Sequence, residues 1–356
     1  SMSGVRTKLP VLARTGLLAL VAVALVGALG ASETSGDLEE LLPHAVLLWK
    51  SAVLAPESGP PGWRLLGVGD VDGDGHEDYG IGSPGAGTGG KAMVFRGAAG
   101  SVSATPAWTV SGTQAGARLG ATITMLGDMN GDGFADWAVG SPEYDGPEEG
   151  CGRVDFFVGG STLQTSPAYT TTGSGAIGAG LGSHPVARGD VTGNGEHDLF
   201  FGAPGTSQGT GQVVVMYKDD LGNMDTSYLD PPFGLGPAAR FGESLACADL
   251  NGDGLADIAV GAPGAGDQGQ GAVFVWYGTP YGLSQGPVWS HSPSVSGHES
   301  FGAQVMGGFD FTGSGHEDIV CADPDYSAPG KAHAGRIFIF AGGSPLPQVV
   351  FKTIQG

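Results

Sequence analysis

The sequence predicts an all-β fold, a β-propeller of four-stranded antiparallel blades, and the composition supplies the first two reasons. The 356 residues include 68 Gly and 23 Pro, about a quarter of the chain, while 40% are apolar and 14% are charged. Disordered chains carry less apolar material and more charge, so we expect this chain to fold. The glycines disfavour long helices, because each interior Gly destabilises a helix by about 1 kcal/mol relative to Ala.

The third reason is an internal repeat with a period of about 60 residues, which indicates one structural unit copied five times. Each copy contains a nine-residue segment rich in Asp and Gly, at residues 70–78, 128–136, 190–198, 249–257 and 310–318. A large apolar residue beside Gly precedes each segment, at Leu66-Gly67 or Trp63 in the first copy and then at Leu119-Gly120, Leu181-Gly182, Phe241-Gly242 and Phe301-Gly302. The apolar run that follows each segment is closed by a small residue or Asp and then Pro.

Every copy offers four short β segments separated by Gly and Pro turns. The two middle segments are almost wholly apolar, as in 273–277, which is typical of strands buried on both faces. The last segment is mixed, as in 107–110 and 288–290, and this favours an outer edge strand. Because a lone four-stranded sheet cannot bury both faces, radial repetition of the unit predicts the propeller.

The combined signature of Phe-Gly, Asp-rich loop and Gly-Ala-Pro resembles the FG-GAP repeat of integrin α-subunit β-propellers and of many secreted or surface proteins. The resemblance extends over residues 44–356 and implies five FG-GAP repeats, as a ring or as part of a larger one. Segments 45–50 and 348–353 both resemble outer strands, which is one too many for a closed five-bladed ring. We therefore expect a displaced strand, or completion of the ring by further blades or by another chain.

The nine-residue segments have the composition of cation-binding loops. Gly at positions 4 and 6 allows a tight turn, so the side chains at positions 1, 3, 5 and 9 converge. Such oxygen ligands suit Ca²⁺ rather than Zn²⁺, and the missing Glu at position 12 excludes an EF-hand. With the carbonyl group at position 7 included, the expected metal ligands are Asp70, Asp72, Asp74, His76, Asp78, Asp128, Asn130, Asp132, Phe134, Asp136, Asp190, Thr192, Asn194, Glu196, Asp198, Asp249, Asn251, Asp253, Leu255, Asp257, Asp310, Thr312, Ser314, His316 and Asp318.

The number of carboxylates at these positions ranks the five loops, because fewer anionic ligands bind Ca²⁺ more weakly. The first loop has four, the second and fourth have three each, and the third and fifth have two each. We expect Ca²⁺ in repeats one, two and four, and weak or absent binding in repeats three and five. There Thr192, Thr312 and Ser314 would instead hydrogen-bond the turn. The ion would be structural, because it removes the repulsion between clustered carboxylates.

The amino-terminal residues predict export. Ser1 is taken as a tag residue, and a basic region then precedes an uncharged stretch at 15–31 that ends in small residues. Residues 1–31 are expected to form a signal peptide or, alternatively, a membrane anchor. A linker at 32–43 and the propeller at 44–356 follow. The protein would then be secreted or at the cell surface, in an extracellular or periplasmic location.

Charge and cysteine content argue against three classes of protein. The formal net charge of −21 argues against nucleic-acid binding, which needs a basic face. Cys151, Cys247 and Cys321 are too few for a disulfide-stapled fold or a Cys-type zinc site, and they allow at most one intrachain bridge.

Three motifs that resemble functional sites are better explained by the repeat. Arg188-Gly189-Asp190 is the tripeptide that integrins recognise in their ligands, but Asp190 belongs to the third loop. Residues 85–91 lack the Ser or Thr and the helix of a P-loop. Residues 205–209 lack the strand–turn–helix context of a nucleophile elbow. No catalytic residue and no organic cofactor site is therefore predicted.

The expected function is non-enzymatic binding of an extracellular protein or glycan ligand, as in adhesion. A carbohydrate-binding lectin, or an accessory propeller of a secreted hydrolase or phospholipase, is the alternative. Trp49, Trp108 and Trp289 lie on predicted outer strands, where packing between blades is favoured over a sugar-binding platform. Segments 143–149 and 219–232 depart from the repeat pattern and are the expected partner faces.

Overall fold

The computed structural model describes residues 64–173, 178–184, 186–218, 224–293, 300–328, 330–331, 333–347 and 349–355. All of them belong to one compact unit, Pro56–Gly356. The predicted signal peptide 1–31, the linker 32–43, segment 45–50 with Trp49, and Trp63 lie outside the described residues. In the described part of the chain, no helix combines the length and the apolar character needed to cross a membrane.

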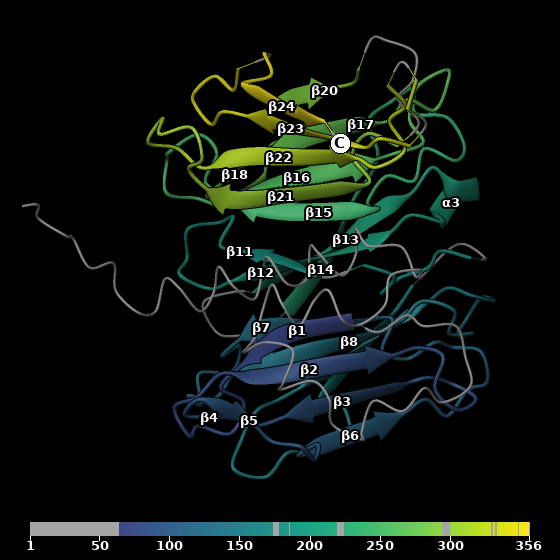
Figure 1. Ribbon diagram of the computed structural model, residues 1–356, viewed down its shortest axis with the longest axis vertical. Coiled ribbons are helices and arrows are strands. Elements are labelled where there is room, and N and C mark those ends of the chain that lie inside the picture. The colour runs from purple at the N-terminus through teal and green to yellow at the C-terminus, as the bar shows by residue number, and fades with distance from the viewer. Residues whose placement is uncertain are drawn as a thin grey trace, which may run out of the picture. The chain divides into compact units, whose positions relative to one another are not determined.

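Each repeat forms one four-stranded antiparallel sheet whose strands lie in chain order (Figure 1). Repeat one consists of β1 (Arg64–Gly69), β2 (Asp78–Ser83), β3 (Lys91–Phe95) and β6 (Trp108–Ser111). Repeat two consists of β7 (Thr122–Gly127), β8 (Asp136–Ser141), β9 (Arg153–Phe157) and β10 (Tyr169–Thr172). Repeat three consists of β11 (Ala187–Gly189), β12 (Asp198–Ala203), β13 (Gln212–Lys218) and β14 (Met224–Leu229). Repeat four consists of β15 (Ser244–Ala248), β16 (Asp257–Ala262), β17 (Ala272–Trp276) and β20 (Trp289–His291). Repeat five consists of β21 (Gln304–Phe309), β22 (Asp318–Asp323), β23 (Arg336–Phe340) and β24 (Lys352–Gln355).

These five sheets confirm the prediction of an all-β fold built from four-stranded antiparallel blades. Two details differ from the sequence prediction, the start of one strand and the structure of one segment. The outer strand of repeat five begins at Lys352 rather than at 348, and segment 219–232, expected to depart from the repeat, supplies the outer strand β14 of repeat three. A polar strand such as β14 (MDTSYL) carries too little apolar signal to be recognised from composition.

Short elements connect the third and fourth strands in two repeats. Two-stranded hairpins are formed by β4 (Gly97–Ala98) with β5 (Ser101–Val102), and by β18 (Gly278–Thr279) with β19 (Gly282–Leu283). A four-residue turn, α3 (Thr206–Gly209), links β12 to β13, and inside it Ser207 and Gln208 have positive φ. Strand β13 follows this turn, so residues 205–209 do not form a nucleophile elbow.

The hydrophobic core lies between consecutive sheets. The cluster between repeats one and two contains Val94, Trp108, Trp137 and Phe157, all at most 3% exposed. Equivalent clusters join repeats two and three, three and four, and four and five. The first strands also lie side by side, β1 against β7, β11 against β15 and β15 against β21. Each sheet is thus buried by its neighbours, as the repeat pattern predicted.

Glycine in the Gly-Ala-Pro signature is required by the approach of the next repeat. A Cβ added at Gly202 would lie 1.8 Å from the carbonyl oxygen of Gly242, which belongs to the Phe-Gly pair of repeat four. The same relation joins Gly82 to Gly120, where the distance would be 2.0 Å. In repeats two to five the corresponding pair lies before the first strand, whereas Leu66 and Gly67 lie inside β1 and Leu66 is 39% exposed. The expected pair Leu66-Gly67 is therefore wrong.

Repeat five departs from this rule. Ala322 stands where the other four repeats have the interface glycine, and Ile337 and Ile354 are 40% and 51% exposed on its sheet. In repeats one to four the corresponding face is covered by the next sheet in the chain.

Candidate calcium-binding loops

The five nine-residue segments all connect the first strand of a sheet to the second. The backbone reverses there through two glycines in the left-handed region, at positions 4 and 6, as at Gly73 (φ 76) and Gly75 (φ 86). Most other residues would be strained at such φ values, which explains why both glycines recur in every repeat.

The Asp at position 1 organises each loop by accepting backbone hydrogen bonds. In loop one the carboxylate of Asp70 accepts N–H groups of Gly73 at 2.8 Å, Asp74 at 3.1 Å and Gly75 at 2.8 Å. The equivalent three bonds form at Asp128, Asp190 and Asp249, and two of them at Asp310. The loop geometry is therefore set by the protein's own donors.

The Asp at position 9 is buried and joins the loop to the end of the third strand. Asp78 is fully buried, and its two oxygens accept N–H groups of Val71 at 3.0 Å and Gly97 at 2.7 Å. Asp136, Asp198, Asp257 and Asp318 repeat this pairing with small changes. The sequence predicted a metal ligand at this position and did not reveal its role as an acceptor for buried backbone donors.

Burial raises the pKa of four of these position-9 carboxyl groups. It raises the pKa of Asp257 to about 7 and that of Asp198 to about 6, despite the N–H donors that favour the ionised form. The pKa values of Asp78 and Asp136 are raised for the same reason, with a further contribution from neighbouring Asp side chains. A cation beside such a carboxylate would favour the ionised form.

Loop one brings three carboxylates together. Ligand oxygens of Asp70, Asp72 and Asp78 all lie within 4.8 Å of one another, and no other described acidic, His or Cys groups form such a cluster. Asp74, at position 5, is exposed and accepts the N–H of His76 at 2.9 Å instead. Arg96 forms an ion pair with Asp72 at 2.5 Å, a partner that the sequence analysis did not identify.

Loops two and four share a second arrangement. The Asn130 amide donates to Asp132 at 3.0 Å, and Asn251 donates to Asp253 at the same distance. The Asn side chain thus ties positions 3 and 5 together and leaves its own oxygen to accept the N–H of Asp132 or Asp253. The carbonyl groups expected to coordinate at position 7 belong to Phe134 and Leu255.

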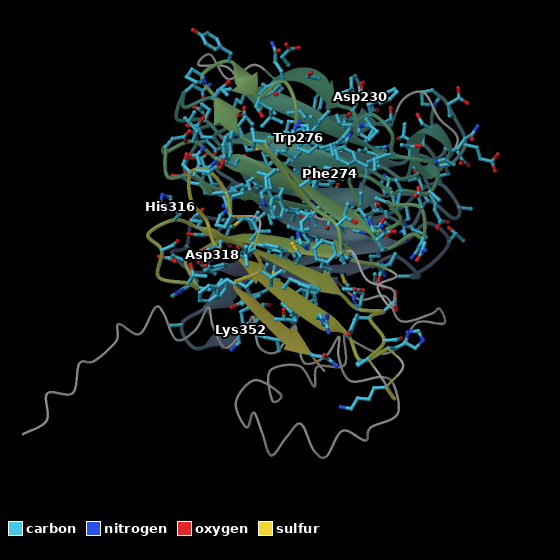
Figure 2. The ribbon with its side chains drawn as sticks, turned by 90° about the horizontal axis from the view of Figure 1, so that it is seen from above. Asp230, Phe274, Trp276, His316, Asp318 and Lys352 are labelled. Carbon is cyan, nitrogen blue, oxygen red and sulfur yellow. The ribbon has the colours of Figure 1, made fainter. Side chains whose placement is uncertain are left out.

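Loops three and five have fewer charges, and their neutral side chains form hydrogen bonds within the repeat. The Asn194 side chain donates to the carbonyl oxygen of Lys218 at 2.8 Å. The hydroxyl group of Thr312 donates to Asp318 at 3.0 Å, and the Ser314 hydroxyl accepts the N–H of His316 at 3.2 Å. Figure 2 shows His316 and Asp318 close together on the loop of repeat five. These contacts match the expectation that Ser and Thr side chains hydrogen-bond the turn.

Consecutive loops touch each other through position 7. The side chain of Phe134 covers Gly73, that of Leu255 covers Gly193 and that of His316 covers Gly252, each so closely that a Cβ on the glycine would lie within 2.7 Å of it. The side chains at position 7 thus pack against the preceding loop, and only their carbonyl groups are available as ligands. The Glu196 side chain pairs with Lys218 instead, and that of His76 in loop one is exposed.

The other residues singled out in the sequence have structural roles. The Trp108 indole is 3% exposed, stacks edge-on against Trp137 and Phe157, and donates to the carbonyl oxygen of Gln164 at 2.8 Å. Trp289 is equally buried, against Phe340 of repeat five. Packing between blades is thus confirmed for both. Arg188 donates to the carbonyl oxygen of Leu126 at 2.8 Å, so the Arg-Gly-Asp tripeptide is held within the fold.

Comparison with known proteins agrees with the repeat assignment. Residues 241–276 match the family model described as FG-GAP repeat. Integrin alpha-5 of Xenopus laevis is 29% identical over 214 residues, which cover 55% of this chain and 19% of that protein. Integrin alpha-V of Gallus gallus is 31% identical over 218 residues, which cover 57% and 20%. An FG-GAP repeat at residues 241–276 and the predicted similarity to the integrin α-subunit are confirmed.

A second group of relatives carries an enzyme name. Phosphatidylinositol-glycan-specific phospholipase D of Mus musculus is 34% identical over 167 residues, which cover 42% of this chain and 19% of that protein. The chain spans about a fifth of the length of the curated relatives it matches. A crystal structure of an exotype rhamnogalacturonan lyase aligns at 16% identity over 85% of this chain and 68% of that one, with a TM-score of 0.38 that supports no argument about fold or function.

Proposed function

We propose that the protein is an exported, calcium-stabilised propeller module that binds an extracellular protein or glycan. The observation that carries the calcium assignment is loop one, where Asp70, Asp72 and Asp78 place ligand oxygens within 4.8 Å of one another. Three carboxylates so close together repel one another, and a divalent cation removes that repulsion. Loops two and four share the fold of loop one and supply one carboxylate fewer.

The chemistry of the loops favours Ca²⁺ over other cations. Their side-chain ligands are carboxylate, amide and hydroxyl oxygens, completed by a backbone carbonyl group, and the residues come from one short loop. Such all-oxygen sets suit Ca²⁺, whereas Zn²⁺ prefers nitrogen and sulfur ligands. Because the loops connect strands of the core sheets, the ion would stabilise the fold rather than take part in a reaction.

The test is thermal unfolding with Ca²⁺ and with EDTA, together with the metal content of the purified protein. We expect EDTA to lower the melting temperature and added Ca²⁺ to restore it. Asp72→Asn is the matched variant, because loops two and four carry Asn at this position and fold in the same way. It should weaken Ca²⁺ binding at loop one and leave the other loops unaffected. An identical melting curve in EDTA, with no metal in the protein, rules out the calcium role.

The adhesion function requires a partner that the module recognises from outside the cell. Affinity pull-down of extracellular proteins and a glycan array, each with and without Ca²⁺, test it directly. The phospholipase D relatives favour a second candidate, an accessory propeller of a secreted hydrolase. Specific binding of a glycan or surface protein by the isolated chain supports the first candidate, and binding only to a co-secreted hydrolase supports the second.

A further inference from the structure

The second residue after the end of the third strand is glycine in four of the five repeats: Gly97, Gly159, Gly278 and Gly342. Its N–H donates to the buried Asp at position 9 of the same repeat. At these four glycines a Cβ would lie 2.0 to 2.6 Å from the carbonyl oxygen at position 8, so a larger residue would require the loop to move. At Gly159, Gly278 and Gly342 the Cβ would also come within 3.0 Å of a carbonyl oxygen at position 2 of the preceding loop.

Repeat three has Lys218 at the equivalent position, where it is the last residue of the longer strand β13. Its N–H keeps the same bond to Asp198, at 2.9 Å. The side chain is 8% exposed, and its ammonium group donates to the carbonyl oxygen of Met129, at position 2 of loop two, and to the Glu196 carboxylate, at position 7 of loop three. One buried cation therefore joins the loops of repeats two and three.

The backbone contacts between these two repeats differ from those elsewhere. The N–H at position 8 donates to the carbonyl oxygen at position 1 of the preceding loop in Ala135 to Asp70 (2.9 Å) and in Ala256 to Asp190 (2.8 Å). The corresponding bond from residue 197 to residue 128 is not formed, although both loops lie in the described part of the chain. Arg188 lies beside Gly127 instead, with its guanidinium where Ala135 lies beside Gly69 and Ala256 beside Gly189.

We infer that Lys218 is a built-in cation that holds the loops of repeats two and three together, so that loop three is stabilised without Ca²⁺. The inference rests on the proposed calcium function, since it assigns to one amino group the electrostatic stabilisation that we propose for Ca²⁺ at loops one, two and four. The ammonium group donates to a carbonyl oxygen of one loop and to a carboxylate of the next. As part of a side chain it cannot dissociate as a bound ion can. Loop three also has the smaller set of carboxylates at the ligand positions, Asp190 and Asp198.

Two pairs of variants test the inference on the full chain. Lys218→Met removes the charge but keeps most of the side-chain volume, and Lys352→Met makes the same change at an exposed residue of β24 (Figure 2). Asp190→Asn changes loop three, and Asp128→Asn makes the same change in loop two. Thermal unfolding with Ca²⁺ and with EDTA gives the stability, and equilibrium dialysis against Ca²⁺ gives the number of bound ions.

We expect Lys218→Met to lower the melting temperature by roughly 3 to 8 °C, because it leaves a buried carbonyl oxygen without its donor. The drop should be the same in Ca²⁺ and in EDTA, while Lys352→Met has no effect. Glu196→Gln, at a partly exposed residue, keeps the protein folded and should give a smaller drop. Asp128→Asn should lose one bound Ca²⁺ and Asp190→Asn none.

Loss of a bound ion in Asp190→Asn overturns the inference, as does equal stability of Lys218→Met and Lys352→Met. The two proposals can fail separately. If the wild-type protein binds no Ca²⁺ at all, the calcium function fails, whereas the role of Lys218 as a cation between the loops is still decided by the melting temperatures in EDTA.

Discussion

Replacing Gly202 by Ala tests whether close approach of the next repeat is what requires glycine in the Gly-Ala-Pro signature. Gly202 lies in β12 and has no positive φ, so Ala strains no backbone angle there. Its Cβ would lie 1.8 Å from the carbonyl oxygen of Gly242, which lies in the turn before β15 at the interface of repeats three and four. The neighbouring repeat must therefore move away by about 1 Å to reach a tolerable contact.

The magnitude follows from what that movement breaks. Two backbone bonds anchor the segment before Gly242, from Arg240 to Gly209 at 2.7 Å and from Phe241 to Thr210 at 2.8 Å. Stretching both loses about 1 kcal/mol each, and overpacking typically adds 1 to 3 kcal/mol. We expect Gly202→Ala to destabilise the protein by about 3 to 5 kcal/mol, or roughly 10 °C in melting temperature.

Urea unfolding followed by tryptophan fluorescence measures this difference, because Trp276 lies in the core cluster at the same interface. The matched control is Gly67→Ala, also in a strand, where an added Cβ would have no neighbour within 4 Å. The control should be neutral or slightly stabilising, since it only reduces the freedom of the unfolded chain. Equal stabilities of the two variants would refute the explanation of the signature.

Two further substitutions separate packing from loop chemistry. Trp108→Ala should open a cavity between repeats one and two and destabilise the protein by about 3 to 5 kcal/mol, as measured by urea unfolding. Its control is Tyr281→Ala, at a residue 99% exposed, which should change stability by less than about 0.5 kcal/mol. Asp78→Ala should lower the free energy of unfolding by about 2 to 6 kcal/mol even in EDTA, because two buried N–H groups lose their acceptor. Its control is Asp74→Ala, at an exposed residue, which should have a much smaller effect in EDTA.

The repeat itself was readable because its residues are constrained one by one. Gly73 and Gly75 need positive φ, Asp70 binds three backbone N–H groups, and Gly82 meets the next repeat. Each constraint acts within one repeat or between neighbours, so it recurs at the same interval in the sequence. The number of sheets and the strands in each could therefore be predicted without long-range information.

The features that were missed are either short or polar elements without a hydrophobic pattern, or side-chain contacts between loops. The composition of the polar strand β14 does not show which strand it joins, and the two small hairpins after β3 and β17 involve only two residues on each side. The roles of Arg96 and Lys218 depend on which loop their side chains reach. The position of Lys218 is nevertheless recognisable in the aligned repeats, since the other four repeats have glycine there.

The hydrogen bonds of the loops bear on how Ca²⁺ would act. The position-1 and position-9 carboxylates already hold their loops in shape through backbone donors, so an ion has little conformation left to impose. Its contribution would be mainly electrostatic. Because the ion binds the folded state, it would raise the free energy of unfolding by about 2.7 kcal/mol per loop when free Ca²⁺ is 100 times the dissociation constant. Three occupied loops would then add roughly 8 kcal/mol at that concentration, comparable to the whole stability of a typical domain. Chelation should therefore shift the unfolding transition strongly while the far-UV circular dichroism of the folded protein stays the same, and a loss of β signal at low temperature in EDTA would contradict this view of the loops.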